Sequence, residues 1–246
     1  MRTVLRRTPG LSDTAGRRAC DPWLVVNDRE LLTRIKRVRD RLAQLGPPRS
    51  RADHDFERVA LPADHADVLR DLLMAERAHV VIEIGLGYGS SALAIGEALA
   101  AQEAGTHLVI DAFQDHFKNA GWDAIVEAGL DQMCSLLTER SQLALPRLLT
   151  DGFVADAAFV DGSHIFHNVF VDLFFLREIV RPGGLIVLDD CDWPSVATAL
   201  RYFEVNAGWR PETRGLLPRL RAFRLPDPRV EPRFEDFTPF GISSSA

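Results

Sequence analysis

The chain has 246 residues, of which 46% are hydrophobic and 26% charged, a composition that suits one globular α/β domain with an N-terminal extension. Its net charge of −6 argues against a nucleic-acid partner, and because no run of 18 apolar residues occurs, no membrane span is expected. Three widely spaced cysteines support neither a disulfide framework nor a C-x-x-C metal site, and the Arg-rich start lacks the apolar core of a signal peptide, so we expect a cytoplasmic protein.

The N-terminal quarter is predicted to be an extension of a main domain at residues 61–225. Residues 1–21 are basic, aperiodic and rich in small polar side chains, which is typical of disorder. Within residues 22–60, a helix is predicted from about Arg29 to Leu45, because its apolar residues fall on one stripe. The main domain or a second copy of the chain must cover that stripe, which leaves a homo-oligomer open.

A buried strand and a glycine-rich turn follow at Val80–Ser91. The apolar run Val80–Ile84 is typical of a strand covered on both faces of a parallel sheet. Three glycines at alternate positions then permit a tight turn and a close approach of the backbone to a ligand. Ser90 or Ser91 is expected to cap the next helix, over about 92–101, whose N-terminus is electropositive.

The acid before this turn indicates what kind of ligand the turn binds. The glycine spacing is G-x-G-x-G, not the dinucleotide spacing G-x-G-x-x-G, so a nicotinamide dehydrogenase is disfavoured. The carboxylate of Glu83, two residues before Gly85, would repel a pyrophosphate. It would attract a cationic ligand that carries an amino group and a sulfonium.

The segment from Glu83 to Gly87 resembles motif I, E-x-G-x-G, of the class I S-adenosylmethionine-dependent methyltransferases. The resemblance implies a Rossmann-like α/β fold with a seven-stranded, mostly parallel sheet of order 3-2-1-4-5-7-6 and helices on both faces. It implies S-adenosylmethionine as the cofactor, with Asp111 holding the ribose diol at the end of the second strand. The expected cofactor contacts are Glu83, Gly85, Gly87, Tyr88, Ser90, Ser91, Asp111, Ala112, Arg140, Ser141 and Asp161.

The rest of the chain alternates strands and helices, the pattern of βαβ units in a parallel sheet. After the first strand, further strands are predicted at 106–110, 133–138, 157–160, 185–188, 209–213 and 220–225. Helices are predicted at 63–76, 142–150, 165–180 and 195–206, and a further short helix is predicted to end at about residue 128. The run 181–184, Arg-Pro-Gly-Gly, is expected to break the chain. The last two strands leave no room for a crossover helix, so one of them is predicted to be antiparallel, and residues 226–246 are predicted to be a tail on the surface.

Acids close the fourth and fifth strands, which are neighbours in the implied order. Asp161 and the Asp189–Asp190 pair should therefore meet outside the carboxyl ends of those strands. Carboxylates that close raise each other's pKa unless a cation neutralises them, and oxygen ligands favour a hard ion, Mg²⁺ first. Without an ion, Asp161 would simply begin a turn, and the later acids would cap a helix.

The pattern V-D-G-S-H, a helix, and then R-P-G-G-L-I-V-L-D-D resembles the metal-dependent O-methyltransferases of the catechol and antibiotic-sugar type. Over residues 61–209 this resemblance implies Asp161, Asp189 and Asp190 as metal ligands. His164 matches a histidine of the sugar-modifying branch and would be the general base, with Asp161 beside it in the catalytic group. The lysine of the catechol branch is absent, which disfavours a catechol acceptor.

The expected function is therefore Mg²⁺-dependent O-methylation of a hydroxyl on a small molecule, a sugar or another secondary metabolite. The alternatives are a metal-independent N- or O-methyltransferase and a non-catalytic S-adenosylmethionine-binding or scaffold protein. In this fold the loop before the first strand often closes over the active site, which makes Asp53, His54 and Asp55 candidate substrate contacts. His54 is the next candidate base, ahead of His167, and Cys191 is expected to be a buried spectator.

Overall fold

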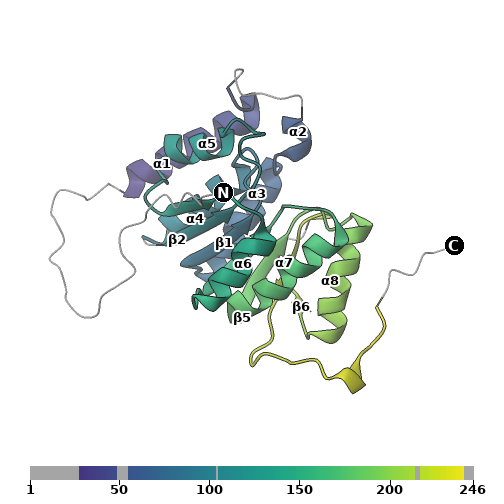
Figure 1. The fold of residues 1–246 in the computed structure, drawn as a ribbon. Coiled ribbons are helices and arrows are strands. Elements are labelled where there is room, and N and C mark those ends of the chain that lie inside the picture. The colour runs from purple at the N-terminus through teal and green to yellow at the C-terminus, as the bar shows by residue number, and fades with distance from the viewer. Residues whose placement is uncertain (1–27, 49–54, 104, 214–216, 241–246) are drawn as a thin grey trace.

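The computed structural model describes residues 28–48, 55–103, 105–213 and 217–240, coloured in Figure 1. The expectations about residues 1–21, Asp53 and His54 concern positions outside these ranges. Within them, helices and strands alternate along the chain and build a single layered sheet.

The sheet has seven strands in the order β3-β2-β1-β4-β5-β7-β6, as the resemblance implied. Strands β1 to β5 pair in parallel, whereas β7 is antiparallel to both β5 and β6. The strands are β1 (Val80–Ile84), β2 (Thr106–Ile110), β3 (Cys134–Leu137), β4 (Ala155–Val160), β5 (Val180–Leu188), β6 (Arg210–Pro211) and β7 (Arg221–Arg224).

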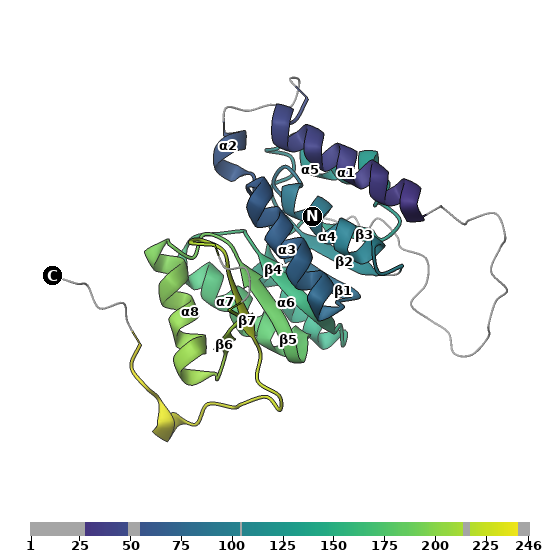
Figure 2. The ribbon, with the colours of Figure 1, turned by 180° about the vertical axis from the view of Figure 1, so that it is seen from behind.

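Helices cover both faces of this sheet. One layer holds α1 (Asp28–Leu45), α3 (Ala63–Glu76), α4 (Ser90–Ala100) and α5 (Ala120–Ala128), and the other holds α6 (Ser141–Thr150), α7 (Phe166–Ile179) and α8 (Pro194–Asn206). The second layer lies in front of the sheet in Figure 1, and the first faces the viewer in Figure 2. Two short helices, α2 (Phe56–Val59) and the 3-10 turn η1 (Phe234–Asp236), lie outside these layers.

The rest of the chain covers the middle of the apolar stripe of α1, whereas Leu45 at the end of the helix is 77% exposed. Ile35, Val38 and Leu42 are buried in a cluster that includes Leu93 of α4 and Ile125 of α5. Burial of such side chains contributes roughly 1.5–3 kcal/mol each. Helix α1 is thus packed into the core of the described chain, while the homo-oligomer stays a prediction.

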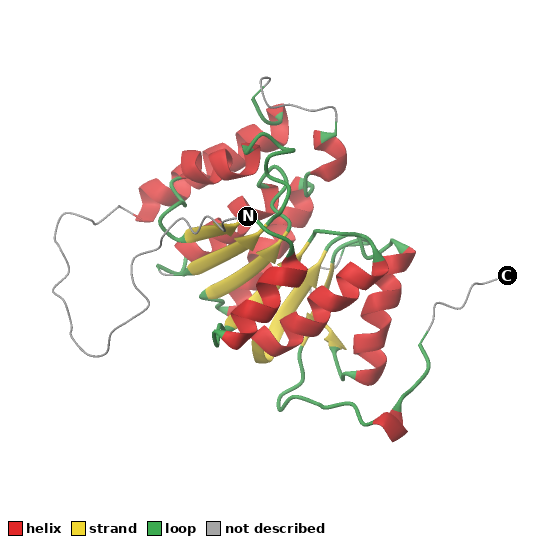
Figure 3. Cartoon of the chain, viewed as in Figure 1, coloured by secondary structure: helices red, strands yellow, loops and turns green. Residues whose placement is uncertain are grey.

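Two local expectations were wrong. The Arg-Pro-Gly-Gly run lies inside β5, which begins at Val180; the pairing with β4 shifts between Ala155 and Ala157 and so accommodates the irregular backbone there. Neither serine caps α4, because its N-cap is Gly89 and no side chain bonds the helix end. Figure 3 shows the strands, in yellow, as one sheet with helices against it.

Among the described residues, no helix is long and apolar enough to cross a membrane. The helix that the sequence marks as apolar nearly all round, α7, buries Val169, Leu173, Leu176 and Ile179. It also leaves Phe174 exposed and buries two polar groups, Asp172 and Arg177. Its packing against α6 and α8 closes one face of the sheet below the cavity described next.

Candidate active site

A cavity of about 800 Å³ lies at the carboxyl ends of the parallel strands. Its volume is that of a site for a small organic ligand. Every residue expected to contact the cofactor, with the exception of Glu83, lines it. The topology explains this convergence, because the turns after β1, β2, β3, β4 and β5 all emerge at one edge of the sheet.

The backbone of the glycine-rich turn lies directly against the chain that leaves the end of β4. Gly85 has a φ of 92°, and a Cβ at this position would lie 2.0 Å from the carbonyl oxygen of Asp161. The backbone N–H of Asp161 in turn donates to the carbonyl of Ile84 at 2.9 Å. Gly85 is thus required by the protein's own backbone, which is a reason the sequence alone did not supply.

Asp111 holds the turn from the end of β2. Its Oδ2 accepts hydrogen bonds from the backbone N–H groups of Leu86 at 2.9 Å and Gly87 at 3.0 Å, and from the Gln114 amide at 3.0 Å. Its Oδ1 accepts from the backbone N–H of Phe113 at 2.6 Å. A carboxylate offers about four acceptor positions, so Oδ1 keeps capacity for a ligand hydroxyl in the cavity that Asp111 lines.

Glu83 does not contribute to the cavity, which corrects the expectation that its carboxylate contacts the cofactor. The side chain is fully buried and accepts a hydrogen bond from the Ser91 hydroxyl. Its other oxygen lies 2.9 Å from Nε2 of His107, an ion-pair distance without the alignment of a hydrogen bond. Glu83 points to the α4 side because successive residues of a strand face opposite sides of the sheet; the sequence could not show that β2 supplies the cation there.

The surroundings of the buried His107 favour its charged form. Burial by itself would lower the pKa of His107, but the neighbouring Cys134 and the Glu83 carboxylate raise this pKa to about 10. Cys134 lies 3.6 Å from the other ring nitrogen. Ser91, Glu83, His107 and Cys134 form one polar chain across β1, β2 and β3 beneath α4, referred to below as the buried polar chain.

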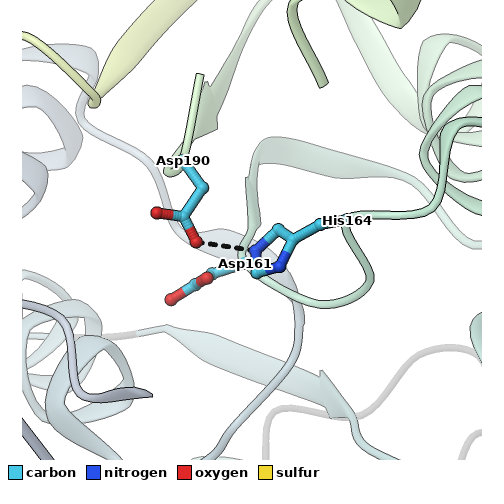
Figure 4. A group of neighbouring side chains, drawn as sticks. All are labelled: Asp161, His164 and Asp190. Atoms are coloured by element: carbon cyan, nitrogen blue, oxygen red, sulfur yellow. Dashed lines mark ion pairs between the residues drawn. The ribbon is translucent and has the colours of Figure 1, made fainter. Parts of the chain in front are cut away.

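Asp161, His164 and Asp190 meet at the ends of β4 and β5, as Figure 4 shows. One ligand atom from each of the three lies within 4.8 Å of the others. Nε2 of His164 is 2.6 Å from Oδ2 of Asp190, and its ring stacks on Trp193 with centroids 5.3 Å apart. A φ of 55° at Asp190 turns the chain sharply after β5. All three residues line the cavity.

Asp189 lies outside this group, which corrects the expected set of metal ligands. Its side chain is 0% exposed and forms a two-point ion pair with Arg219, with Nε 3.1 Å from Oδ1. Nδ1 of His65 lies 3.4 Å from the same oxygen, on the side of α3. Asp189 and Asp190 are adjacent in sequence, yet only Asp190 reaches the cavity.

The electrostatics of the cluster follow from its crowding. Burial first, and then the charges of Asp189 and Asp190, raise the pKa of Asp161 to about 8, although His164 and Arg219 oppose this rise. Contact with Asp190 raises the pKa of His164, and the same contact lowers the pKa of Asp190. The raised pKa of Asp161 means that its ionised carboxylate is disfavoured in this crowded group, and a bound cation would favour that ionised form.

Several cavity residues were not anticipated from the sequence. They form a cover over the glycine-rich turn and comprise Arg58, Val59, Ala60, Leu61, Phe113, His116 and Phe117. Tyr88 anchors this cover. Its hydroxyl donates a hydrogen bond to Asp55 at 2.6 Å. Its ring packs edge-on against the rings of Phe56 and Phe117, with centroids 5.1 and 5.0 Å away. Asp55 thus braces the cover through Tyr88. The only sequence signal was the polar loop before the first strand.

The other histidine and cysteine candidates are also placed. His167 lines the cavity but is exposed. Cys191 is buried outside the cavity, and desolvation raises the pKa of its thiol to about 12, as suits a spectator.

Comparisons with known proteins agree with this geometry. Residues 82–191, from β1 to just past Asp190, match the family model described as a methyltransferase domain. The O-methyltransferase TomG of Streptomyces achromogenes, involved in tomaymycin synthesis and solved with S-adenosylmethionine, is 20% identical; the match covers 82% of this chain and 92% of TomG with a TM-score of 0.56.

Two further solved structures share the fold. An O-methyltransferase from Bacillus cereus in complex with SAH is 14% identical, covering 82% of this chain and 93% of the other, with a TM-score of 0.54. The TDP-rhamnose 3′-O-methyltransferase of calicheamicin biosynthesis is 15% identical, covering 80% and 93%, with a TM-score of 0.52. These similarities establish the fold of the chain.

Proposed function

Because residues 82–191 match a methyltransferase domain model and the chain has the fold of known O-methyltransferases, we propose that it transfers the methyl group of S-adenosylmethionine to a hydroxyl of a small molecule. The observation that carries the proposal is the position of the cluster of Asp161, His164 and Asp190. It adjoins a cavity whose other wall is the glycine-rich turn and Asp111. The acid expected to hold the ribose, Asp111, and the acids expected beside the reacting hydroxyl, Asp161 and Asp190, thus line the same cavity.

The cofactor fits the wall formed by β1, β2 and β3. Oδ1 of Asp111 retains capacity for a ribose hydroxyl, and the turn at Gly85 and Gly87 brings backbone close to the ligand. Arg140 and Ser141, after β3, line the part of the cavity where the adenine is expected. Asp111, the glycine-rich turn and the segment after β3 would therefore bind and orient the cofactor.

The cluster at β4 and β5 fits a divalent cation. Asp161 and Asp190 supply carboxylate oxygens that Mg²⁺ or Mn²⁺ prefers, and the raised pKa of Asp161 indicates acids that are crowded without an ion between them. An ion held there would lower the pKa of an acceptor hydroxyl. Asp161 and Asp190 would orient that hydroxyl, and His164 would accept its proton as the oxygen attacks the methyl group in line.

A small-molecule acceptor of the secondary-metabolite class has independent support. TomG acts in tomaymycin synthesis and another neighbour methylates TDP-rhamnose. A histidine rather than a lysine three residues past Asp161 also agrees with a sugar-like hydroxyl and disfavours a catechol.

The proposal is tested by binding and turnover of the full chain. Calorimetry is expected to show binding of S-adenosylmethionine and its demethylated product, but not of NAD. Transfer of a radiolabelled methyl group to a panel of hydroxylated metabolites should then stop in EDTA and return with Mg²⁺.

The outcomes separate the alternatives. Full transfer in EDTA after dialysis would establish the metal-independent methyltransferase. Binding of the cofactor without transfer to any acceptor, in the presence of Mg²⁺ or Mn²⁺, would favour the non-catalytic binding protein. Binding of NAD in place of S-adenosylmethionine would contradict the assignment.

A further inference from the structure

We propose that Arg219 is a resident counter-ion that removes Asp189 from the metal site, so that a divalent ion is held from Asp161 and Asp190 and not from the Asp189–Asp190 pair. The inference rests on the proposed function and deepens it, because it names the residue that sets the ligand number and the metal affinity of the site. Arg219 acts through the carboxylates, as a positioning residue.

The contacts of Arg219 cover both carboxylates of the pair. Its Nε lies 3.1 Å from Oδ1 of Asp189, and its Nη2 contacts Oδ2 of the same residue. Its Nη1 lies 3.5 Å from Oδ1 of Asp190. A two-point guanidinium–carboxylate pair is geometrically specific and engages both oxygens that a metal would need.

The fold fixes Arg219 at this position. Strand β7 runs antiparallel to β5 with Leu188 opposite Arg221, so the residues just before β7 lie beside the carboxyl end of β5. The carbonyl of Arg219 accepts the backbone N–H of Cys191 at 2.9 Å, directly after the acidic pair. The guanidinium is therefore held by the backbone at the place where the two acids emerge.

The same arrangement distinguishes the two acids. Asp189 is fully buried between Arg219 and His65, whereas Asp190 reaches the cavity and contacts His164. The positive charge of Arg219 lies beside both carboxylates of the Asp189–Asp190 pair. It follows that Arg219 lowers the affinity of the site for a cation, both by repelling the ion and by occupying Asp189.

The test measures Mn²⁺ binding by the full chain, stripped with EDTA, using electron paramagnetic resonance to count free Mn²⁺. Arg219→Gln is expected to tighten Mn²⁺ binding at least about tenfold, because it removes a nearby positive charge and frees a third carboxylate. Arg219→Lys keeps the charge but loses the two-point contact, so it should tighten binding by a smaller factor. Arg221→Gln is the matched control: Arg221 is two residues away and pairs with Glu204 at 3.0 Å, so its loss should leave Mn²⁺ binding unchanged.

Thermal unfolding of each variant establishes that it folds, and Arg219→Lys decides the question if Arg219→Gln does not fold. Weaker or unchanged Mn²⁺ binding in the folded Arg219 variants would overturn the inference, and so would equal tightening in Arg221→Gln. If the wild type binds no Mn²⁺ but Arg219→Gln does, the result supports the role of Arg219 and contradicts the metal dependence in the proposed function. If neither protein binds Mn²⁺, the result contradicts both the role of Arg219 and the metal dependence.

Discussion

His164 is held on three sides by the segment that follows β5. Asp190 contacts its Nε2 at 2.6 Å, Trp193 stacks on its ring, and the Ser195 hydroxyl donates to its carbonyl oxygen at 2.6 Å. A ring oriented in this way beside the cavity has the position required of a general base. The packing also distinguishes it from His167, which lines the cavity but is exposed.

His164→Ala is therefore expected to lower kcat about 10²–10⁴-fold, the usual cost of losing a general base. Cofactor affinity should stay nearly the same, because His164 lies on the β4–β5 side of the cavity and away from Asp111. Steady-state kinetics with the acceptor, and calorimetry with the demethylated cofactor, measure the two effects separately. A larger loss in His167→Ala than in His164→Ala would transfer the role of base to His167.

At the scale of elements, the buried polar chain joins β1, β2 and β3 to α4. Its ionic pair, Glu83 and His107, belongs to neighbouring parallel strands and meets diagonally, since His107 is paired with Val81, two residues before Glu83. The Ser91 hydroxyl completes it from α4. Glu83 thus links α4 to β1, and this link holds both ends of the glycine-rich turn between them.

His107→Gln is expected to destabilise the fold by roughly 3–5 kcal/mol near pH 6.5, because it leaves a buried carboxylate without its cation. The pKa of His107 is raised, so its contribution is fully present below the unfolded value of about 6.5 and is lost as pH rises through about 10. Urea unfolding of both proteins at pH 6.5 and 10 measures this. The gap in the free energy of unfolding should narrow at the higher pH.

A neutral pair supplies the matched control. The double variant Glu83→Gln with His107→Gln carries no buried charge at this position, so it should be more stable than His107→Gln alone. A gap between wild type and His107→Gln that is constant or widens with pH would contradict the ionic account.

At the scale of the whole molecule, the segment 226–240, which includes the yellow ribbon that runs below the sheet in Figure 2, forms hydrogen bonds with the ends of α7 and α8. Arg229 donates to the carbonyls of Glu178 at 2.5 Å and Val180 at 3.0 Å, at the end of α7. Arg177 on α7 donates back to the carbonyl of Val230 at 3.0 Å. Farther along, Asn206 at the end of α8 exchanges two hydrogen bonds with the backbone of Thr238.

Arg229→Ala is expected to lower the free energy of unfolding by about 1–3 kcal/mol, because it removes the donor for two carbonyls at the end of a helix. Arg233→Ala is the matched control on the same segment, since Arg233 is exposed and pairs only with nearby acids in η1. Thermal or urea unfolding compares the two. Equal effects would show that the segment contributes no specific contact through Arg229.

The sequence by itself determined most element bounds to within about two residues, because buried parallel strands and glycine-rich turns are local patterns, and the order of the sheet followed from the resemblance to the methyltransferases. The helix over 63–76 and the strand over 106–110 agree with the prediction residue for residue. It also determined which edge of the sheet carries the site, since acids closing strands of known order must meet there. The division at residues 60 and 225 stays a prediction.

Only the tertiary structure decided which of these acids face the cavity. Side chains on a strand alternate between the two faces of the sheet, and each buried acid pairs with a cation that is distant in sequence. Glu83 pairs with His107 on the α4 side of the sheet, and Asp189 pairs with Arg219, apart from the cavity that Asp190 reaches. Neither cation is marked by a local motif, because each reaches its partner through strand pairing. The sequence therefore predicted where the acids gather, while long-range charge pairing decided which of them reach the cavity.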